Sequence, residues 1–162
     1  MADLTPLDEK LGEVLGLAQA AQDTAQKVAK MEGADPFAAD LERMRSEGED
    51  VERRTMGLVE TLEGKKTAIV EKGRETKKEA SEMRDAYLEG EEEALDGFEF
   101  MTMAEAGEVG HWQVLEQMNK KAKHPGIRQL TKEQLAIQKR HLREVMLAAT
   151  TVAAQEDPDE EG

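Results

Sequence analysis

The sequence predicts an all-α protein in which two antiparallel helical hairpins pack as a single four-helix bundle. Apolar residues recur in alternating steps of four and three over most of the 162 residues, which is the period of one face of an α-helix. Asp35-Pro36 and His124-Pro125-Gly126 interrupt this pattern where helices are expected to end. Aromatic residues make up 3% of the chain and charged residues 36%, a composition typical of long helices rather than of sheets.

The first hairpin is predicted to occupy residues 6–62. Thr5 supplies an N-cap, Pro6 suits the first helical position, and Gly33 marks the end of the first helix. The apolar face of this helix consists of Leu7, Leu11, Val14, Ala18, Ala21, Ala25 and Val28. The second helix repeats the rhythm and ends at Gly64, with an inner face of Phe37, Leu41, Met44, Gly48, Val51, Thr55, Leu58 and Leu62. Because the link between them is short, we expect the two helices to lie antiparallel.

Residues 65–90 have a weaker apolar pattern among many Lys and Glu residues. We expect them to form a poorly buried, partly helical crossover to the second hairpin, residues 94–155. The last helix is predicted to begin at Thr131, which can form a capping box with Gln134. Residues 1–155 are therefore predicted to form one domain, and residues 156–162 an acidic, disordered tail.

Composition limits the functions that the chain can have. Its formal net charge of −14 opposes binding to nucleic acid or to anionic lipid, so we expect neither as a partner. With no cysteine, the chain has no disulfide and no thiolate ligand, and any metal would be held by oxygen and nitrogen. The sequence shows no signal-peptide pattern and no apolar stretch long enough to span a bilayer, and we therefore expect a cytoplasmic protein.

Four polar residues lie in or beside the predicted inner faces of the second hairpin. Glu108 and His111 are three residues apart and share a helix face, as do His141 and Glu144. If the chain is folded back at its proline break, the two histidines fall at nearly equal distances from the turn. We therefore expect Glu108, His111, His141 and Glu144 to meet in one interior site.

Two interpretations of this site follow from the cost of burying charge, since a buried carboxylate must be paired, protonated or bound to metal. In the first, the four residues form a hydrogen-bond network that fixes the register of the helices. In the second, they bind iron, manganese or zinc, which accept carboxylate and imidazole ligands.

The second hairpin resembles the YciF-type branch of the ferritin-like superfamily, a group of bacterial four-helix proteins associated with stress. The resemblance rests on the Glu108-x-x-His111 pair, the histidine on the following helix and the Ala-Ala-x-Glu-Asp-Pro sequence after it. The resemblance implies two helical hairpins joined by a crossover, and a metal site with Glu-x-x-His on two helices. This sequence has Gln138-x-x-His141 on the last helix and Glu47-x-x-Asp50 on the second, so the ligand set that the resemblance implies is incomplete.

Two hypotheses for function come from different classes. The first is a non-catalytic, degenerate ferritin-like bundle that forms at least a homodimer, or that binds another helical protein. Apolar residues beside the inner face of the first helix, such as Leu15 and Ala29, suggest more apolar surface than one neighbouring helix can cover. The alternative is a metal-binding ferritin-like protein with a role in stress. No paired nucleophile and base, phosphate loop or cofactor motif points to an enzyme.

Overall fold

The computed structural model describes residues 2–162 and shows an all-helical protein, which confirms the all-α part of the predicted fold class but has five α-helices rather than four. Residue 1 of the predicted domain lies outside this range. Within it are five α-helices and one short 3-10 helix: α1 (Pro6–Ala29), η1 (Asp35–Phe37), α2 (Ala38–Glu60), α3 (Lys66–Tyr87), α4 (Ala94–Ala122) and α5 (Pro125–Ala153). Among the described residues, no helix is both long and apolar enough to cross a membrane.

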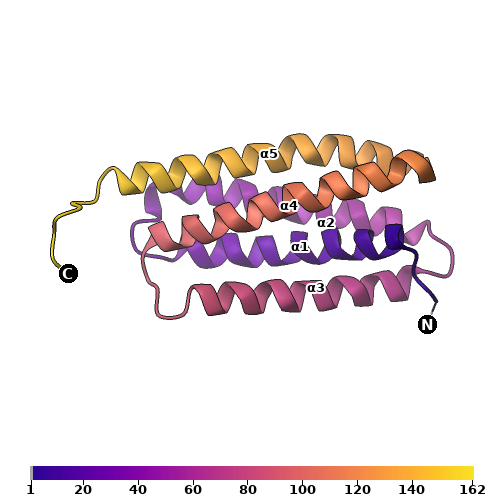
Figure 1. The fold of residues 1–162 in the computed structure, drawn as a ribbon, viewed down its shortest axis with the longest axis horizontal. Coiled ribbons are helices and arrows are strands. Elements are labelled where there is room, and N and C mark those ends of the chain that lie inside the picture. Colours follow the sequence, from indigo (N-terminus) through magenta and orange to yellow (C-terminus); the bar gives the residue numbers. More distant parts are fainter. Residues whose placement is uncertain (1) are drawn as a thin grey trace.

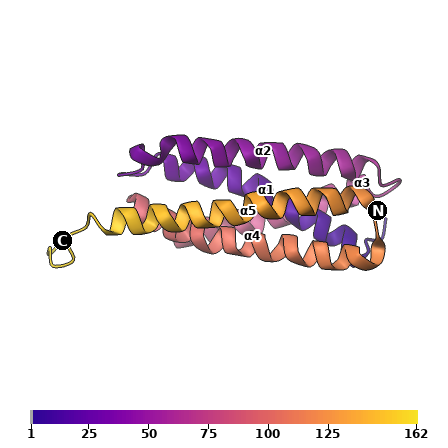
Figure 2. The same ribbon diagram turned by 90° about the horizontal axis from the view of Figure 1, so that it is seen from above.

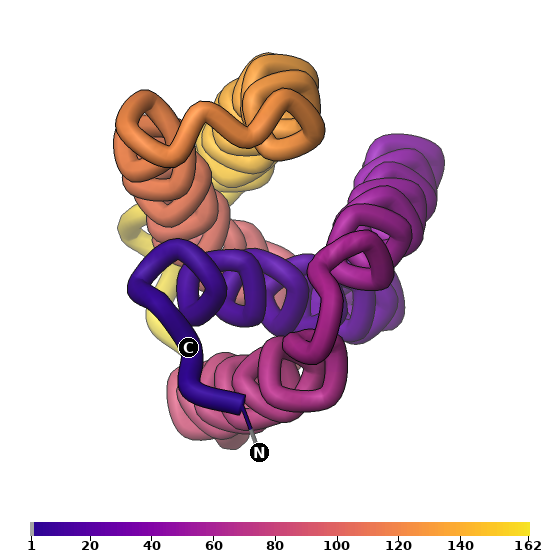
Figure 3. Tube along the Cα trace, turned by 90° about the vertical axis from the view of Figure 1, so that its right-hand side faces the viewer, coloured from indigo at the N-terminus to yellow at the C-terminus, as the bar shows by residue number. Residues whose placement is uncertain are grey.

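Helix α1 has the most neighbours and lies along α2, α3 and α4 (Figures 1 and 3). Helices α4 and α5 pair closely, and α5 also approaches α2 (Figure 2). The loops at one end are joined by backbone hydrogen bonds, from the Glu32 amide to the Glu92 carbonyl at 2.9 Å and from the Ala94 amide to the Glu32 carbonyl at 2.8 Å. Both predicted hairpins are therefore present, and a fifth helix is added to them.

That fifth helix, α3, corrects the prediction that the crossover is only partly helical, but it is poorly buried as predicted, with only Ala68, Ile69 and Gly73 buried. It is a continuous helix of 22 residues that packs lengthwise on α1. The contact is close because both helices carry glycine at the crossing. A Cβ atom added to Gly16 would overlap the Gly73 carbonyl oxygen and lie 2.9 Å from the Lys77 amide nitrogen. Ile69 fills the same contact and is completely buried.

The position of α3 also changes the argument for self-association. Leu15 was expected to face a second copy of the chain, but only 1% of its surface is exposed, and its side chain packs against Gly73 of α3. The chain thus supplies its own cover for this side of α1. Any association of copies has to use a different surface.

The ends of the helices follow their local sequence. Thr5 and Asp8 form a reciprocal capping box at the start of α1, and Lys65 donates to the Asp8 carboxylate at 2.6 Å. The predicted start of the last helix at Thr131 is wrong, because α5 already begins at Pro125. His124 is its N-cap, and the imidazole Nδ1 accepts from the Gly126 amide at 3.1 Å.

The turn between α4 and α5 is therefore very short. Lys123 adopts a left-handed conformation with φ of 57°, and the Asn119 side chain is hydrogen-bonded to both the amide and the carbonyl of His124. These bonds satisfy backbone groups that the reversal of direction would otherwise leave without partners. The two long helices consequently stay side by side up to their connection.

Candidate binding pocket between α1, α3 and α4

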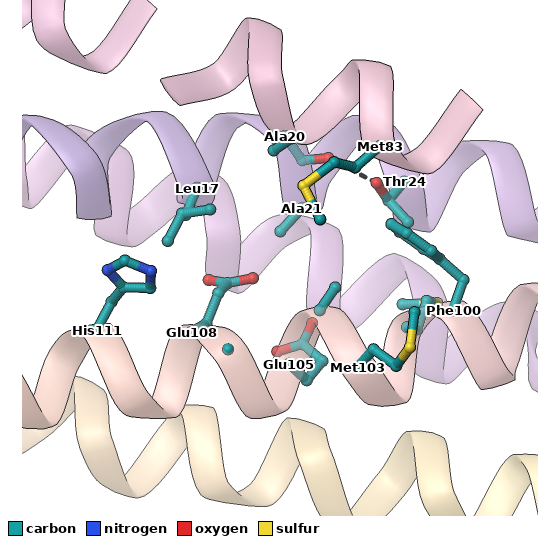
Figure 4. Close-up of a pocket in the computed structure, with 14 residues that line it drawn as sticks. Leu17, Ala20, Ala21, Thr24, Met83, Phe100, Met103, Glu105, Glu108 and His111 are labelled. Atoms are coloured by element: carbon teal, nitrogen blue, oxygen red, sulfur yellow. Dashed lines mark hydrogen bonds between the residues drawn. The ribbon is translucent and has the colours of Figure 1, made fainter. Parts of the chain in front are cut away.

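A pocket of about 240 Å³ opens between α1, α3 and α4 (Figure 4). We call it the α1–α3–α4 pocket. It is lined by Leu17, Ala20, Ala21 and Thr24 of α1, Ala80 and Met83 of α3, and Phe100, Met101, Met103, Ala104, Glu105, Gly107, Glu108 and His111 of α4.

The pocket exists because small residues face one another across the gap. Ala20 and Ala21 of α1 and Ala104 and Gly107 of α4 all line it, and their short side chains leave the space between the helices open. Flexible Met side chains stand at the rim, and the surfaces of Met83 and Met103 are 68% and 53% exposed. Methionine at such a rim can adapt to ligands of different shape.

Glu108 is the principal polar group in this apolar wall. Only 5% of its surface is exposed, and its carboxyl group extends from α4 toward Leu17 and Ala21 (Figure 4). Among the described residues, no hydrogen bond or ion pair reaches it. Burial first, and then the charge of Glu105, raise the pKa of Glu108 well above its ordinary value. The environment therefore favours the protonated carboxyl group or demands a cation beside it.

Glu105 lies one turn before Glu108 on α4, and its hydrogen-bonding and charged partners are on α5. Its carboxylate accepts a hydrogen bond from the Gln138 amide of α5, and Gln134 in turn donates to Gln138 at 3.0 Å. The Nδ1 atom of His141 lies 3.8 Å from the same carboxylate. Glu105 is thus tied to α5, whereas Glu108 is left without a partner on α5.

His141 joins three helices through its two ring nitrogens. While Nδ1 faces Glu105 of α4, Nε2 lies 3.2 Å from the Glu47 carboxylate of α2. Burial opposes protonation of the ring, but the hydrogen bonds and charges of Glu105 and Glu47 outweigh burial and raise the pKa of His141. Glu47 also binds Arg140, and despite its burial these two neighbours lower the pKa of Glu47.

The other two predicted site residues, His111 and Glu144, lie apart from the group formed by His141, Glu105 and Glu47. His111 is at the outer end of the pocket, where its Nδ1 is 3.3 Å from the Glu13 carboxylate and 3.2 Å from the Lys10 ammonium, both on α1. Burial, and then the charge of Lys10, lower the pKa of His111. Glu144 faces α2 and forms an ion pair with Arg43 at 2.6 Å.

The four predicted residues do not all meet in one site: Glu108 lines the α1–α3–α4 pocket with His111 and a small interior cavity with His141, whereas Glu144 lines neither. Within residues 2–162, no group of three or more metal-ligating side chains is placed so that it could hold a metal ion. Equal distance from the turn fixes how far along its helix each histidine lies. It does not fix the direction in which the side chain points around the helix axis. His111 turns toward α1 and His141 toward α2 and α4, so they have different neighbours.

The error can be traced to the choice of inner face on α4. The apolar spacing predicts an inner row of Met101, Ala104, Glu108, His111, Leu115, Met118 and Ala122, whereas the buried row is Met101, Glu105, Glu108, Trp112, Leu115 and Asn119. The two rows share Glu108 but differ in whether His111 or Trp112 faces inward. Both rows follow steps of four and three. The row with Trp112, the chain's single tryptophan, would have indicated Glu105 as an interior residue. Glu47 gave no such signal, because it lies beside the apolar row of α2.

Comparisons with known proteins identify no family. No protein-family model matches the chain, and it matches neither a curated protein nor a solved structure.

Proposed function

We propose that the chain is a non-catalytic binding protein whose α1–α3–α4 pocket takes a small apolar amine. The observation that carries this proposal is the buried, unpartnered carboxyl group of Glu108 in an apolar wall that is open to solvent. A site with one buried polar group discriminates strongly between ligands that do and do not satisfy that group. The pocket volume, about 240 Å³, suits a ligand smaller than the drug-sized molecules that occupy larger protein pockets.

An amine is favoured over a neutral or anionic ligand by the local charge. Glu105 lies one turn from Glu108, and its negative charge contributes to the raised pKa of Glu108. An ammonium group placed at Glu108 would relieve this repulsion and replace the missing partner. Binding would then release the proton of Glu108 to solvent, since the pair is stable only with an ionised carboxylate.

The test is calorimetric titration with three probes of equal chain length: hexylamine, 1-hexanol and hexanoate. We expect hexylamine to bind most tightly, with proton release detected at pH 6 as a heat that depends on the ionisation enthalpy of the buffer. Glu108→Gln keeps the shape of the side chain but should remove the preference for hexylamine over hexanol. Ala21→Leu, which fills the pocket, should weaken the binding of both.

Glu99→Gln is the matched control, because Glu99 is an exposed carboxylate on the same helix. It removes one negative charge without changing the pocket, and hexylamine binding should be retained. Equal or tighter binding of hexanoate would contradict the proposal, and so would hexylamine binding that survives both Glu108→Gln and Ala21→Leu.

A further inference from the structure

Four cationic side chains gather at the end of the molecule where α4 turns into α5. Lys120, Lys123, Arg128 and Lys132 line a surface depression of about 620 Å³, together with one carboxylate, Glu116. We call this depression the basic pocket. All four cations are exposed, and the short turn at Lys123 brings the end of α4 and the start of α5 close enough for both to contribute.

These cations have no carboxylate partners within residues 2–162. The nearby acidic residue Glu133 binds Arg54 of α2 instead. Such segregation is unexpected in this chain, because Asp and Glu outnumber Lys and Arg by 36 to 22. Most cations in such a chain can find a carboxylate nearby, as Arg45 does with Glu42 and Glu49. The basic pocket is thus a local positive field on an acidic protein.

The opposite charge lies at the other end of the molecule. The segment after α5 contains no helix, is exposed throughout, and carries five acidic residues: Glu156, Asp157, Asp159, Glu160 and Glu161. It extends away from the helices at the end opposite to the α4–α5 turn (Figures 1 and 2). Its five negative charges are opposite in sign to the four cations of the basic pocket.

The acidic segment is too short to dock in the basic pocket of its own chain. Between Arg128 and Ala153, α5 rises about 38 Å. Residues 154–161 span at most about 28 Å when fully extended. Even a taut segment would bring only its last acidic side chains near the rim, so full pairing of the charges requires a second molecule.

We propose that the acidic residues 156–161 of one copy bind the basic pocket of a second copy. Two copies placed antiparallel present each segment to the other's pocket, and two identical contacts then close a symmetric dimer. The second contact forms within an already joined pair, which strengthens the association beyond that of one contact. This surface differs from the apolar side of α1 that the sequence suggested, and it does not depend on the function proposed for the α1–α3–α4 pocket.

Sedimentation equilibrium of the full chain at low ionic strength, and again in about 0.5 M salt, tests the proposal, because contacts between exposed charges are screened by salt. We expect a dimer at low salt whose dissociation constant rises at least tenfold at high salt. A chain that stops at Gln155 and the double variant Lys123→Glu/Arg128→Glu should each be monomeric at both salt concentrations. Circular dichroism should show that both variants remain folded.

Lys139→Glu/Arg143→Glu is the matched control. Both residues are exposed on α5 outside the basic pocket, and the change in net charge is the same. This variant should still dimerise. Mixing the shortened chain, which keeps its pocket, with Lys123→Glu/Arg128→Glu, which keeps its acidic segment, should restore a salt-sensitive heterodimer through one contact.

A full chain that is monomeric at low salt would overturn the proposal. Dimers that persist in high salt, or that survive both removal of the segment and reversal of the pocket charges, would also overturn it and would indicate an apolar interface. Equal loss of dimer in the control variant would show a general effect of net charge, and the proposal would then be abandoned.

Discussion

The Nδ1 atom of His141 lies 3.8 Å from the carboxylate of Glu105, and this pair links α5 to α4 inside the protein. Both side chains are buried. The opposite ring nitrogen of His141 faces Glu47, so that one imidazole is shared between two carboxylates. A protonated ring satisfies both of them, which is why the pKa of His141 is raised in spite of burial. The polar network is therefore a structural element that connects α2, α4 and α5.

Replacing His141 by Ala should destabilise the protein by about 3 kcal/mol, because Glu105 and Glu47 would both lose a partner. The raised pKa means that this stabilisation is complete below the ordinary pKa of histidine and is lost as the pH rises through the folded-state value. The cost of His141→Ala, measured by urea denaturation, should consequently be larger at pH 5.5 than at pH 9.

His111→Ala provides the comparison, since His111 is partly exposed and lies at the outer end of the pocket. Its loss should cost less than about 1 kcal/mol. Chelator and added iron, manganese or zinc should leave the effect of His141→Ala unchanged. A destabilisation that appears only after metal is removed would contradict the network and support metal binding.

Glu108→Gln should stabilise the free protein at neutral pH by about 1–3 kcal/mol, because an amide avoids the cost of ionising a buried, unpartnered carboxyl group. The raised pKa of Glu108 means that the folded protein binds a proton more tightly than the unfolded chain does. Below the ordinary pKa of glutamate, the native carboxyl group is protonated in both states and does not lower the free energy of unfolding. That free energy falls as the pH rises toward the pKa of Glu108 in the folded protein.

Urea denaturation of the native chain and of Glu108→Gln at pH 4, 6 and 8 measures this difference. The two proteins should have similar stability at pH 4 and should diverge as the pH increases. A constant difference across the three pH values would mean that Glu108 has the same pKa in the folded and unfolded states.

Gly16→Ala should destabilise the protein by roughly 1–3 kcal/mol or more, because the added Cβ atom has no space against the backbone of α3. Neither the Gly73 carbonyl nor the Lys77 amide can move without shifting α3. Thermal unfolding measures the loss as a lower melting temperature.

Gly57→Ala is the opposite case on α2, where an added Cβ meets nothing within 4 Å. Alanine should stabilise the helix there by about 0.5–1 kcal/mol, because glycine loses more backbone entropy on folding. If both substitutions changed the melting temperature in the same direction, the close packing of α3 on α1 would be wrong.

Local sequence was sufficient to predict the type of structure and most of the helix ends. The 3–4 spacing of apolar residues predicted the helices of both hairpins, and Thr5-Pro6 marked the start of α1 as observed. The start of α5 was missed by about two turns. A capping box at Thr131 predicts a start there, whereas α5 uses the His124 imidazole as its cap. Helix caps are interactions between residues close in sequence. They can therefore be recognised from the sequence when every side chain able to accept a hydrogen bond from the first amides, including histidine, is considered.

The faces that the helices bury were decided by tertiary packing. On α4, the rows through His111 and through Trp112 have the same periodicity, and only contact with α1 and α5 selects the second. Likewise, Gly12, Gly16 and Gly73 could weaken a helix or allow two helices to approach, and only the placement of α3 on α1 shows the latter. Rotation about a helix axis and the choice of neighbour depend on residues far apart in sequence. The partners of Glu108, His111, His141 and Glu144 were therefore determined by the fold as a whole.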